Sequence, residues 1–231
     1  MNFYDELISA TAHARQQMSS IPVIQDGVAG RISRESYIAF LTQAYHHVKY
    51  TVPLLMACGA RLPQSYEWLR VAVGEYIEEE MGHQEWILND IQACGVDAEE
   101  IRHGTPNMHT ELMVAYAWDT IQRRNPLGFF GMVLVLEGTS VEFATPAAKA
   151  IQQSLGLPKK AFSYLSSHGS LDLGHVELFK TLMNRIDNRE DKDAIIHTAT
   201  VMYTLYGNIF RSLPHNARHS KSATELDHEI A

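Results

Sequence analysis

The chain has 231 residues, of which 45% are hydrophobic and 20% are charged. This composition is typical of a globular protein, and the length is enough to bury one sizeable core. The formal net charge is −8 and the pI is about 5.8, and an acidic surface argues against nucleic acid and against an anionic membrane as partners.

The first fifteen residues contain no basic start followed by an apolar block, so the sequence predicts no secretory signal. No stretch approaches the roughly 20 uninterrupted apolar residues that a membrane span needs. Cys58 and Cys94 lie far apart and in no metal-ligand spacing, which is typical of buried thiols in a reducing compartment. We therefore expect a soluble, cytoplasmic protein.

Helical periodicity begins near the N-terminus, and strand alternation is nearly absent throughout. The first helix is expected from about Phe3 to Met18, followed by a loop over residues 19–31. Ser33 is predicted to cap a long helix, because apolar residues then recur at helical spacing. Pro53 should kink or restart that helix, since proline cannot donate a backbone hydrogen bond.

The second half of the chain continues the helical pattern, with a short acidic turn over residues 97–106. The pattern predicts an all-α protein, a single multi-helix bundle of roughly seven or eight helices. Residues 1–212 would form this helical domain, and residues 213–231 a polar C-terminal tail. The later helices are expected over residues 63–93, 108–123, 127–155, 159–186 and 190–211.

Three groups of polar residues interrupt the apolar faces of these helices, and the first is Glu80 with His83. Residues three apart lie on the same helix face, and Glu-x-x-His pairs that project into a bundle are common in carboxylate-bridged di-metal sites. Glu79 shares a face with His83 as well, since the two are four residues apart. On its own, this pattern also fits a solvated acidic turn with a surface histidine.

The second group is His168, Asp172 and His175, whose spacings of four and three also place them on one helix face. Three such groups crowd one another unless a positive charge lies between them, although a polar face with a hydrogen-bonded histidine would show the same spacing. The third is Glu137, which follows the apolar run 132–136. A carboxylate there must be neutral, paired or metal-bound, and a salt bridge or a hydrogen-bonded core acid is the alternative.

Together the three groups predict a metal site made of carboxylate and imidazole ligands, which suit iron or manganese and would accept zinc. No cysteine takes part, so an iron–sulfur site is not expected. Glycines flank the candidate ligands, among them Gly82 and Gly138. Each costs about 1 kcal/mol in a helix relative to alanine, so we interpret them as allowing helices to pack closely around a small centre.

With these ligands in place, the chain resembles the haem-oxygenase-like di-iron oxidases and oxygenases, which share a fold with TenA thiaminases, haem oxygenase and pyrroloquinoline-quinone synthase. The resemblance covers residues 1 to about 212. It implies that Glu137 bridges two metals. Many members carry the first Glu seven residues before its His, where this chain has Tyr76. Other members use Glu-x-x-His, so the resemblance gives that role to Glu80, with Glu79 in reserve.

The resemblance also implies an enzyme that activates O₂ at two ferrous ions and oxidises a small organic molecule, such as a carboxylic or amino acid. The second iron is often weakly held, so Mn or Zn could occupy the isolated protein. Beyond the ligands, Tyr45, His46 and His47 are candidates for a catalytic role at the same cavity. Packing of Tyr45 in the core and a surface position for one of the histidines is the alternative.

Rival functions remain open. The segment around His13 is similar to the proximal-histidine helix of haem oxygenase, which would make the protein a haem enzyme. A TenA-like thiaminase would need a nucleophilic cysteine in the pocket, and a pyrroloquinoline-quinone-synthase-like oxidase would need no metal. A metal- or ligand-binding protein without turnover would share every ligand named above. Nothing in the sequence decides whether the chain forms a homodimer.

Overall fold

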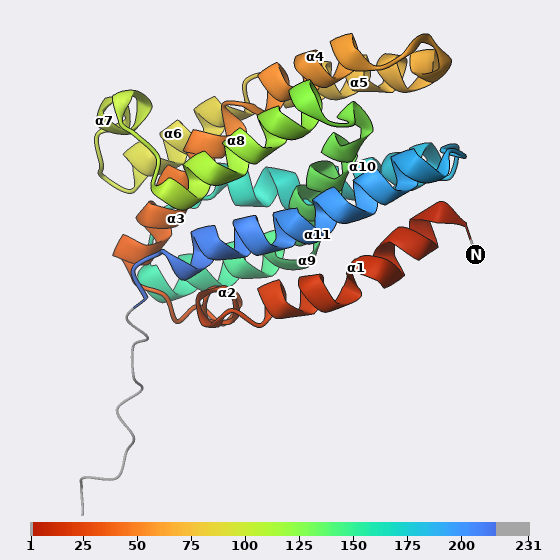
Figure 1. Ribbon diagram of the computed structural model, residues 1–231. Helices are drawn as coiled ribbons and strands as arrows, with labels where there is room; N and C mark the ends of the chain where they lie inside the picture. The colour runs from red at the N-terminus through yellow and green to blue at the C-terminus, as the bar shows by residue number, and fades with distance from the viewer. Residues whose placement is uncertain (1, 216–231) are drawn as a thin grey trace, which may run out of the picture.

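The computed structural model describes residues 2–215, except for the side chains of residues 168–175. Within these residues the chain forms α-helices and short 3₁₀ turns and no strand, which confirms the predicted all-α class (Figure 1). The helices are α1 (Phe3–Ser19), α2 (Pro22–Val28), α3 (Arg34–Val48), α4 (Thr51–Arg61), α5 (Glu67–Glu80), α6 (His83–Ala93), α7 (Ala98–His103), α8 (Met108–Arg123), α9 (Phe129–Leu155), α10 (Ser163–Met183) and α11 (Arg189–Arg211).

Side-chain caps define where several of these helices begin. The hydroxyl of Ser33 accepts the backbone N–H of Ser36 at the start of α3, as predicted. Asn107 and Asn188 cap α8 and α11 in the same way. Each cap satisfies one of the backbone donors that the first turn of a helix leaves without an intrahelical partner. The chain then restarts as α4 at Thr51, two residues before Pro53, which confirms the expected interruption.

Two expected loops are partly helical. Residues 19–31 contain α2, because Pro22 occupies its first turn, where proline is favoured and no backbone donor is lost. Residues 97–106 contain α7, which the Asp97 side chain caps. These short helices, and a break in the predicted helix 63–93, raise the number of α-helices in the described residues to eleven.

The long helix α9 lies at the centre and packs against α10, α11 and α2. Figure 1 shows α9 and α11 side by side through the middle of the molecule, with α1 on one side and α4, α5 and α8 on the other. The contact between α9 and α11 requires glycine at Gly131. A β-carbon there would lie 2.5 Å from the backbone N of Ala199 and 2.6 Å from the carbonyl O of Ile195.

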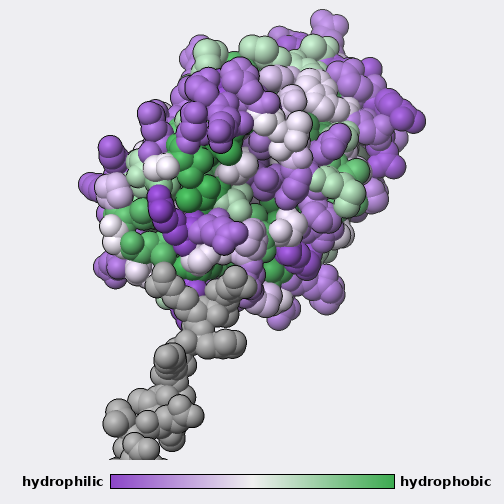
Figure 2. All heavy atoms as spheres, turned by 90° about the vertical axis from the view of Figure 1, so that its left-hand side faces the viewer, coloured by the Kyte–Doolittle hydropathy of each residue, from purple (hydrophilic) through white to green (hydrophobic). Residues whose placement is uncertain are grey.

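Buried apolar side chains from α1 through α11 form one continuous core. The surface is mainly polar, and Figure 2 shows apolar patches between polar side chains at the end of the molecule that is on the left in Figure 1. Residues Pro126–Leu155 are long and apolar enough to cross a membrane, and 61% of their most apolar stretch is buried inside the bundle. A buried core helix has the same length and composition, so these two properties are weak evidence for a membrane span.

The predicted tail begins in contact with the bundle. Leu213 is buried, the hydroxyl of Ser36 donates to the carbonyl of Pro214, and His215 Nε2 lies 2.8 Å from a carboxylate oxygen of Asp26. The Asp26 carboxylate also accepts from Arg31. Residues 216–231 lie outside the described part of the chain.

Candidate metal centre

A cavity of about 160 Å³ lies inside the bundle and is lined by residues of α2, α3, α4, α5, α9, α10 and α11. Most of its wall is apolar. Polar side chains reach it as well, among them Glu80 of α5 and Glu137 of α9. Tyr76, one turn before Glu80, is buried and lines the same cavity. Two of the predicted ligands therefore share one cavity, although they lie on different helices.

His83 lies next to Glu80, but the two are not on one helix as predicted. Helix α5 ends at Glu80 and α6 begins at His83, because Gly82 adopts a φ of 94° that interrupts the helix. His83 is buried, and its Nδ1 lies 3.1 Å from Glu80 Oε2. Its ring also packs on Trp86, with a centroid distance of 4.0 Å. The break therefore still brings the predicted pair into contact.

The glycine interpretation is wrong for the two flanking glycines that the structure describes. A β-carbon at Gly82 or at Gly138 would meet no atom within 4 Å, so neither position serves close helix packing. Gly82 is instead required by its left-handed backbone conformation. Glycine serves close packing at Gly131, away from the candidate ligands.

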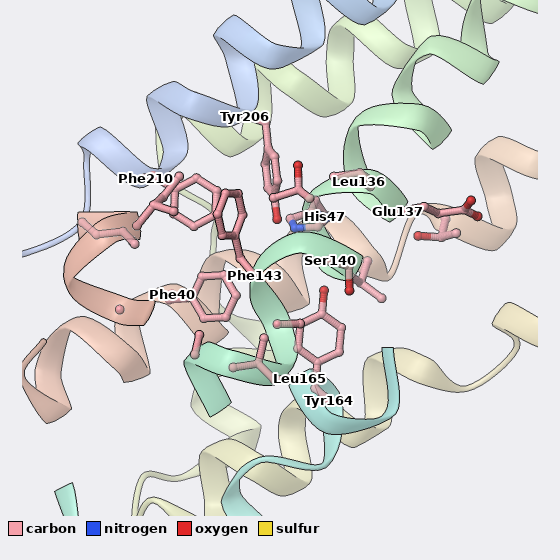
Figure 3. Close-up of a pocket in the computed structure, with 18 of the residues that line it drawn as sticks. Phe40, His47, Leu136, Glu137, Ser140, Phe143, Tyr164, Leu165, Tyr206 and Phe210 are labelled. Atoms are coloured by element: carbon pink, nitrogen blue, oxygen red, sulfur yellow. The ribbon is translucent and has the colours of Figure 1, made fainter. Parts of the chain in front are cut away.

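The glutamates on α5 and α9 differ in their solvent exposure. Glu78 and Glu79 are exposed, whereas the side chain of Glu80 is 12% exposed. On α9, Glu137 is partly buried, and Glu142 is exposed, as expected from its position further round the helix. Figure 3 shows Glu137 on one side of the cavity, with Leu136 and Ser140 nearby on the same helix. The less exposed carboxylates are thus the ones that reach the cavity.

The remaining predicted ligands, His168, Asp172 and His175, belong to the part of α10 whose side chains lie outside the described residues. The helix itself packs against α9, which carries Glu137, and against α6, which begins with His83. Within the residues whose side chains are described, no group of three or more His, Cys, Asp or Glu side chains is arranged to hold a metal ion. Three of the six predicted ligands therefore lie outside the described side chains.

Asp90 holds the beginning of α10, and the sequence analysis missed it. Its carboxylate is fully buried and accepts the backbone N–H groups of Ser163 at 3.0 Å and of Tyr164 at 2.9 Å, together with the Ser163 hydroxyl. Burial raises the pKa of Asp90, and these hydrogen bonds oppose the rise. Its helical spacing from the apolar residues Ile87 and Ile91 could have revealed a carboxylate on a buried face.

Of the three catalytic candidates on α3, only His47 lines the cavity. Its ring meets the ring of Tyr206 edge-on, with centroids 5.7 Å apart. His46 and Tyr45 contact each other and Lys49 instead. Both histidines are buried, so the expected surface position for one of them is wrong. Among the nearby aromatic residues, Phe129 and Tyr164 line the cavity, and Phe130 is buried in the core.

A family model described as iron-containing redox enzyme matches residues 38–207 of the chain. The chain belongs to the iron-containing redox enzyme family. The resemblance noted in the sequence is thereby confirmed. No curated protein matches the chain significantly by sequence.

Solved structures show the same fold as this family member. A domain of unknown function with a haem-oxygenase-like fold from Shewanella denitrificans matches with a TM-score of 0.79 and 23% identity, over 90% of each chain. A TenA homologue from Pseudomonas syringae matches with a TM-score of 0.75 and 13% identity, over 90% of this chain and 91% of that chain. Haem oxygenase-1 from Synechocystis, solved with haem, matches with a TM-score of 0.71 and 11% identity, over 91% of each chain. The predicted haem-oxygenase-like fold is confirmed.

The described residues fit the iron that the family name implies. Glu80, His83 and Glu137 supply carboxylate and imidazole groups, which iron accepts. His83 Nδ1 and Glu80 Oε2 lie 3.1 Å apart, which is a hydrogen-bond distance. The chemistry of the donor set therefore fits iron.

Proposed function

We propose that this iron-containing redox enzyme is a non-haem di-iron oxidase or oxygenase, with a mixed manganese–iron centre as the alternative, that uses O₂ to oxidise a small organic molecule in the cavity. Mn or Zn could occupy the isolated protein. The proposed ligands are Glu80, His83, Glu137, His168, Asp172 and His175.

One observation carries this proposal: Glu80 and Glu137 line the same largely apolar cavity from two different helices. Carboxylates that face a largely apolar cavity are stabilised by nearby cations or by protonation. A pair of divalent ions would stabilise both glutamates. The ions would also supply the redox capacity that side chains lack.

The chain's own residues would perform three tasks. The apolar wall, which includes Leu136 and Met132, excludes water from the space beside the glutamates. The buried ring of His83 contacts Glu80 and Trp86, which would fix the orientation of the ring. Asp90 fixes the first turn of α10, the helix that carries the other three proposed ligands.

The rival mechanisms find less support in the described residues. Neither Cys58 nor Cys94 lines the cavity, and burial raises the pKa of Cys58 to about 12, which suppresses the reactive thiolate. The Cys58 thiol donates to the carbonyl of Pro126, 3.4 Å away. His13, the candidate haem ligand, is exposed on α1 and does not line the cavity.

Anaerobic titration of metal-free protein with ferrous iron, followed by O₂ consumption, tests the proposal. We expect uptake near two irons per chain, and sharply lower uptake in His83→Ala and Glu137→Gln. Glu142→Gln is the matched control, because Glu142 lies on the same helix but is exposed. A folded wild-type protein that takes up no iron would contradict the proposal. Iron uptake without O₂ consumption under any substrate tried would favour a binding protein without turnover.

The thiol rival has its own test. The double variant Cys58→Ser with Cys94→Ser should retain O₂ consumption, because neither thiol lies at the cavity. Loss of activity in a folded double variant would reopen the TenA-like mechanism.

We further propose that the protein acts in the cytoplasm on a small molecule, without nucleic acid or membrane partners. The net charge of −8 supports this, because an acidic surface repels polyanions. A homodimer would be compatible with this function, and size-exclusion chromatography with light scattering measures the oligomeric state.

A further inference from the structure

The cavity extends away from the glutamates into an aromatic end. Phe40 of α3 and Phe210 of α11 stack with their ring centroids 5.9 Å apart and their planes 17° apart, and Phe143 of α9 lines the same region. Figure 3 shows these three rings gathered on the side of the cavity opposite Glu137. Flat aromatic walls of this kind bind apolar chains or rings through area and dispersion.

Tyr206 lies between the aromatic end and Glu137. It is only 7% exposed, and its ring contacts both His47 and Phe210. Its hydroxyl forms no hydrogen bond within the described residues, and it lines the cavity. Figure 3 shows the ring reaching from α11 toward the cavity. A hydroxyl that faces a largely apolar cavity without a protein partner is available to donate to a bound acceptor.

The cavity wall also carries no fixed positive charge away from the proposed centre. Among residues 2–215, no Lys or Arg lines it, and the sequence of residues 168–175 contains neither. An anionic group in the aromatic end would lose its hydration without gaining a counter-charge. The lining therefore favours an uncharged occupant there.

From these three observations we propose that the substrate is a largely apolar, uncharged molecule with a hydrogen-bond-accepting oxygen. Its apolar body fills the aromatic end formed by Phe40, Phe143 and Phe210. Its oxygen accepts the hydroxyl hydrogen of Tyr206, which makes Tyr206 a residue that determines specificity. The assignment of this ligand as the substrate rests on the proposed function, because it places the molecule beside Glu80 and Glu137.

Binding of small probes to metal-free protein tests this proposal by calorimetry. Acetophenone, ethylbenzene and benzoate have similar sizes but present a neutral acceptor, no acceptor and an anion. We expect acetophenone to bind about 5-fold more tightly than ethylbenzene, as one net hydrogen bond implies. Benzoate should bind at least 10-fold more weakly than acetophenone. Equal binding of benzoate and acetophenone would overturn the proposal.

Two variants and one control locate the effect. Tyr206→Phe should remove the preference for acetophenone over ethylbenzene while keeping ethylbenzene binding. Tyr203→Phe is the matched control, because Tyr203 lies on the same helix and is buried but does not line the cavity. Ala147→Phe should weaken all probes by filling the cavity. An unchanged preference in folded Tyr206→Phe would contradict the role of its hydroxyl.

The outcome is distinguishable from a failure of the proposed function. Probe binding uses no iron, and iron uptake by Tyr206→Phe should equal that of the wild type. Loss of the probe preference with normal iron uptake in the wild type would overturn only the substrate inference. Probe binding as expected without any iron uptake would overturn only the di-iron proposal.

Discussion

The Asp90 carboxylate of α6 accepts the backbone N–H of Tyr164, in the first turn of α10, at 2.9 Å. The same carboxylate accepts the N–H of Ser163, so one side chain pairs two donors at a helix start that lies 73 residues further along the chain. It thereby joins the helix that begins with His83 to the helix that carries His168, Asp172 and His175.

Asp90→Asn should lower the free energy of unfolding by about 1–2 kcal/mol, because an amide offers one acceptor oxygen and leaves a buried donor unpaired. Urea unfolding measures the change. Iron uptake should weaken too, since the start of α10 is no longer held. Asp97→Asn, at the exposed cap of α7, is the control and should be nearly neutral, because asparagine caps helices equally well. Equal effects of the two substitutions would contradict the role given to Asp90.

His46 should make the protein sensitive to acid. Burial, with a smaller contribution from Lys49, lowers the pKa of His46 to about 4, and its Nε2 has no hydrogen-bond partner in the described residues. The unfolded chain binds the proton near pH 6.5, so stability is full above that pH and is lost as pH falls toward 4. The slope should be at most about 1.4 kcal/mol per pH unit.

Urea unfolding from pH 7.5 to 4.5 measures this dependence. His46→Phe should flatten the curve, whereas His197→Gln, at an exposed position on α11, should leave it unchanged. A curve in His46→Phe that matches the wild type would assign the acid sensitivity to other groups.

Gly82→Ala should destabilise the protein by about 1–2 kcal/mol, because φ is 94° there and a β-carbon disfavours that conformation. The β-carbon would meet no neighbour, so the cost comes from the backbone alone. Gly138→Ala is the matched control. It lies inside α9, also with nothing within 4 Å, and should stabilise by up to about 1 kcal/mol. Thermal unfolding of both variants measures these changes in stability. A stabilised Gly82→Ala would show that the break between α5 and α6 is not obligatory.

Of the three substitutions Gly82→Ala, Gly138→Ala and Gly131→Ala, the last should lower the free energy of unfolding the most. The new methyl group would overlap the backbone of α11 at Ala199 and Ile195, so the helices must separate at a cost of about 1–3 kcal/mol. Unfolding in guanidinium chloride measures the loss. A neutral effect would mean that the α9–α11 contact is looser than the distances indicate.

The sequence determined the helical class, the family and most helix boundaries, because these follow from local periodicity and from caps such as Ser33 and Asn107. It also singled out Glu80, through its spacing of three from His83, and Glu137, because a carboxylate directly after an apolar run is conspicuous. It did not reveal the break at Gly82, since a glycine in a helical pattern is compatible with either a helix or a turn.

Only the tertiary structure decided which side chains share a cavity. His47 and Tyr206 line it and His46 does not, although adjacent histidines look alike in sequence. Asp90 meets the start of α10 through contacts between distant helices, and helix tilt and rotation set those contacts. Local periodicity predicts which residues share one face of a helix. Packing against the neighbouring helices decides which residues that face contacts.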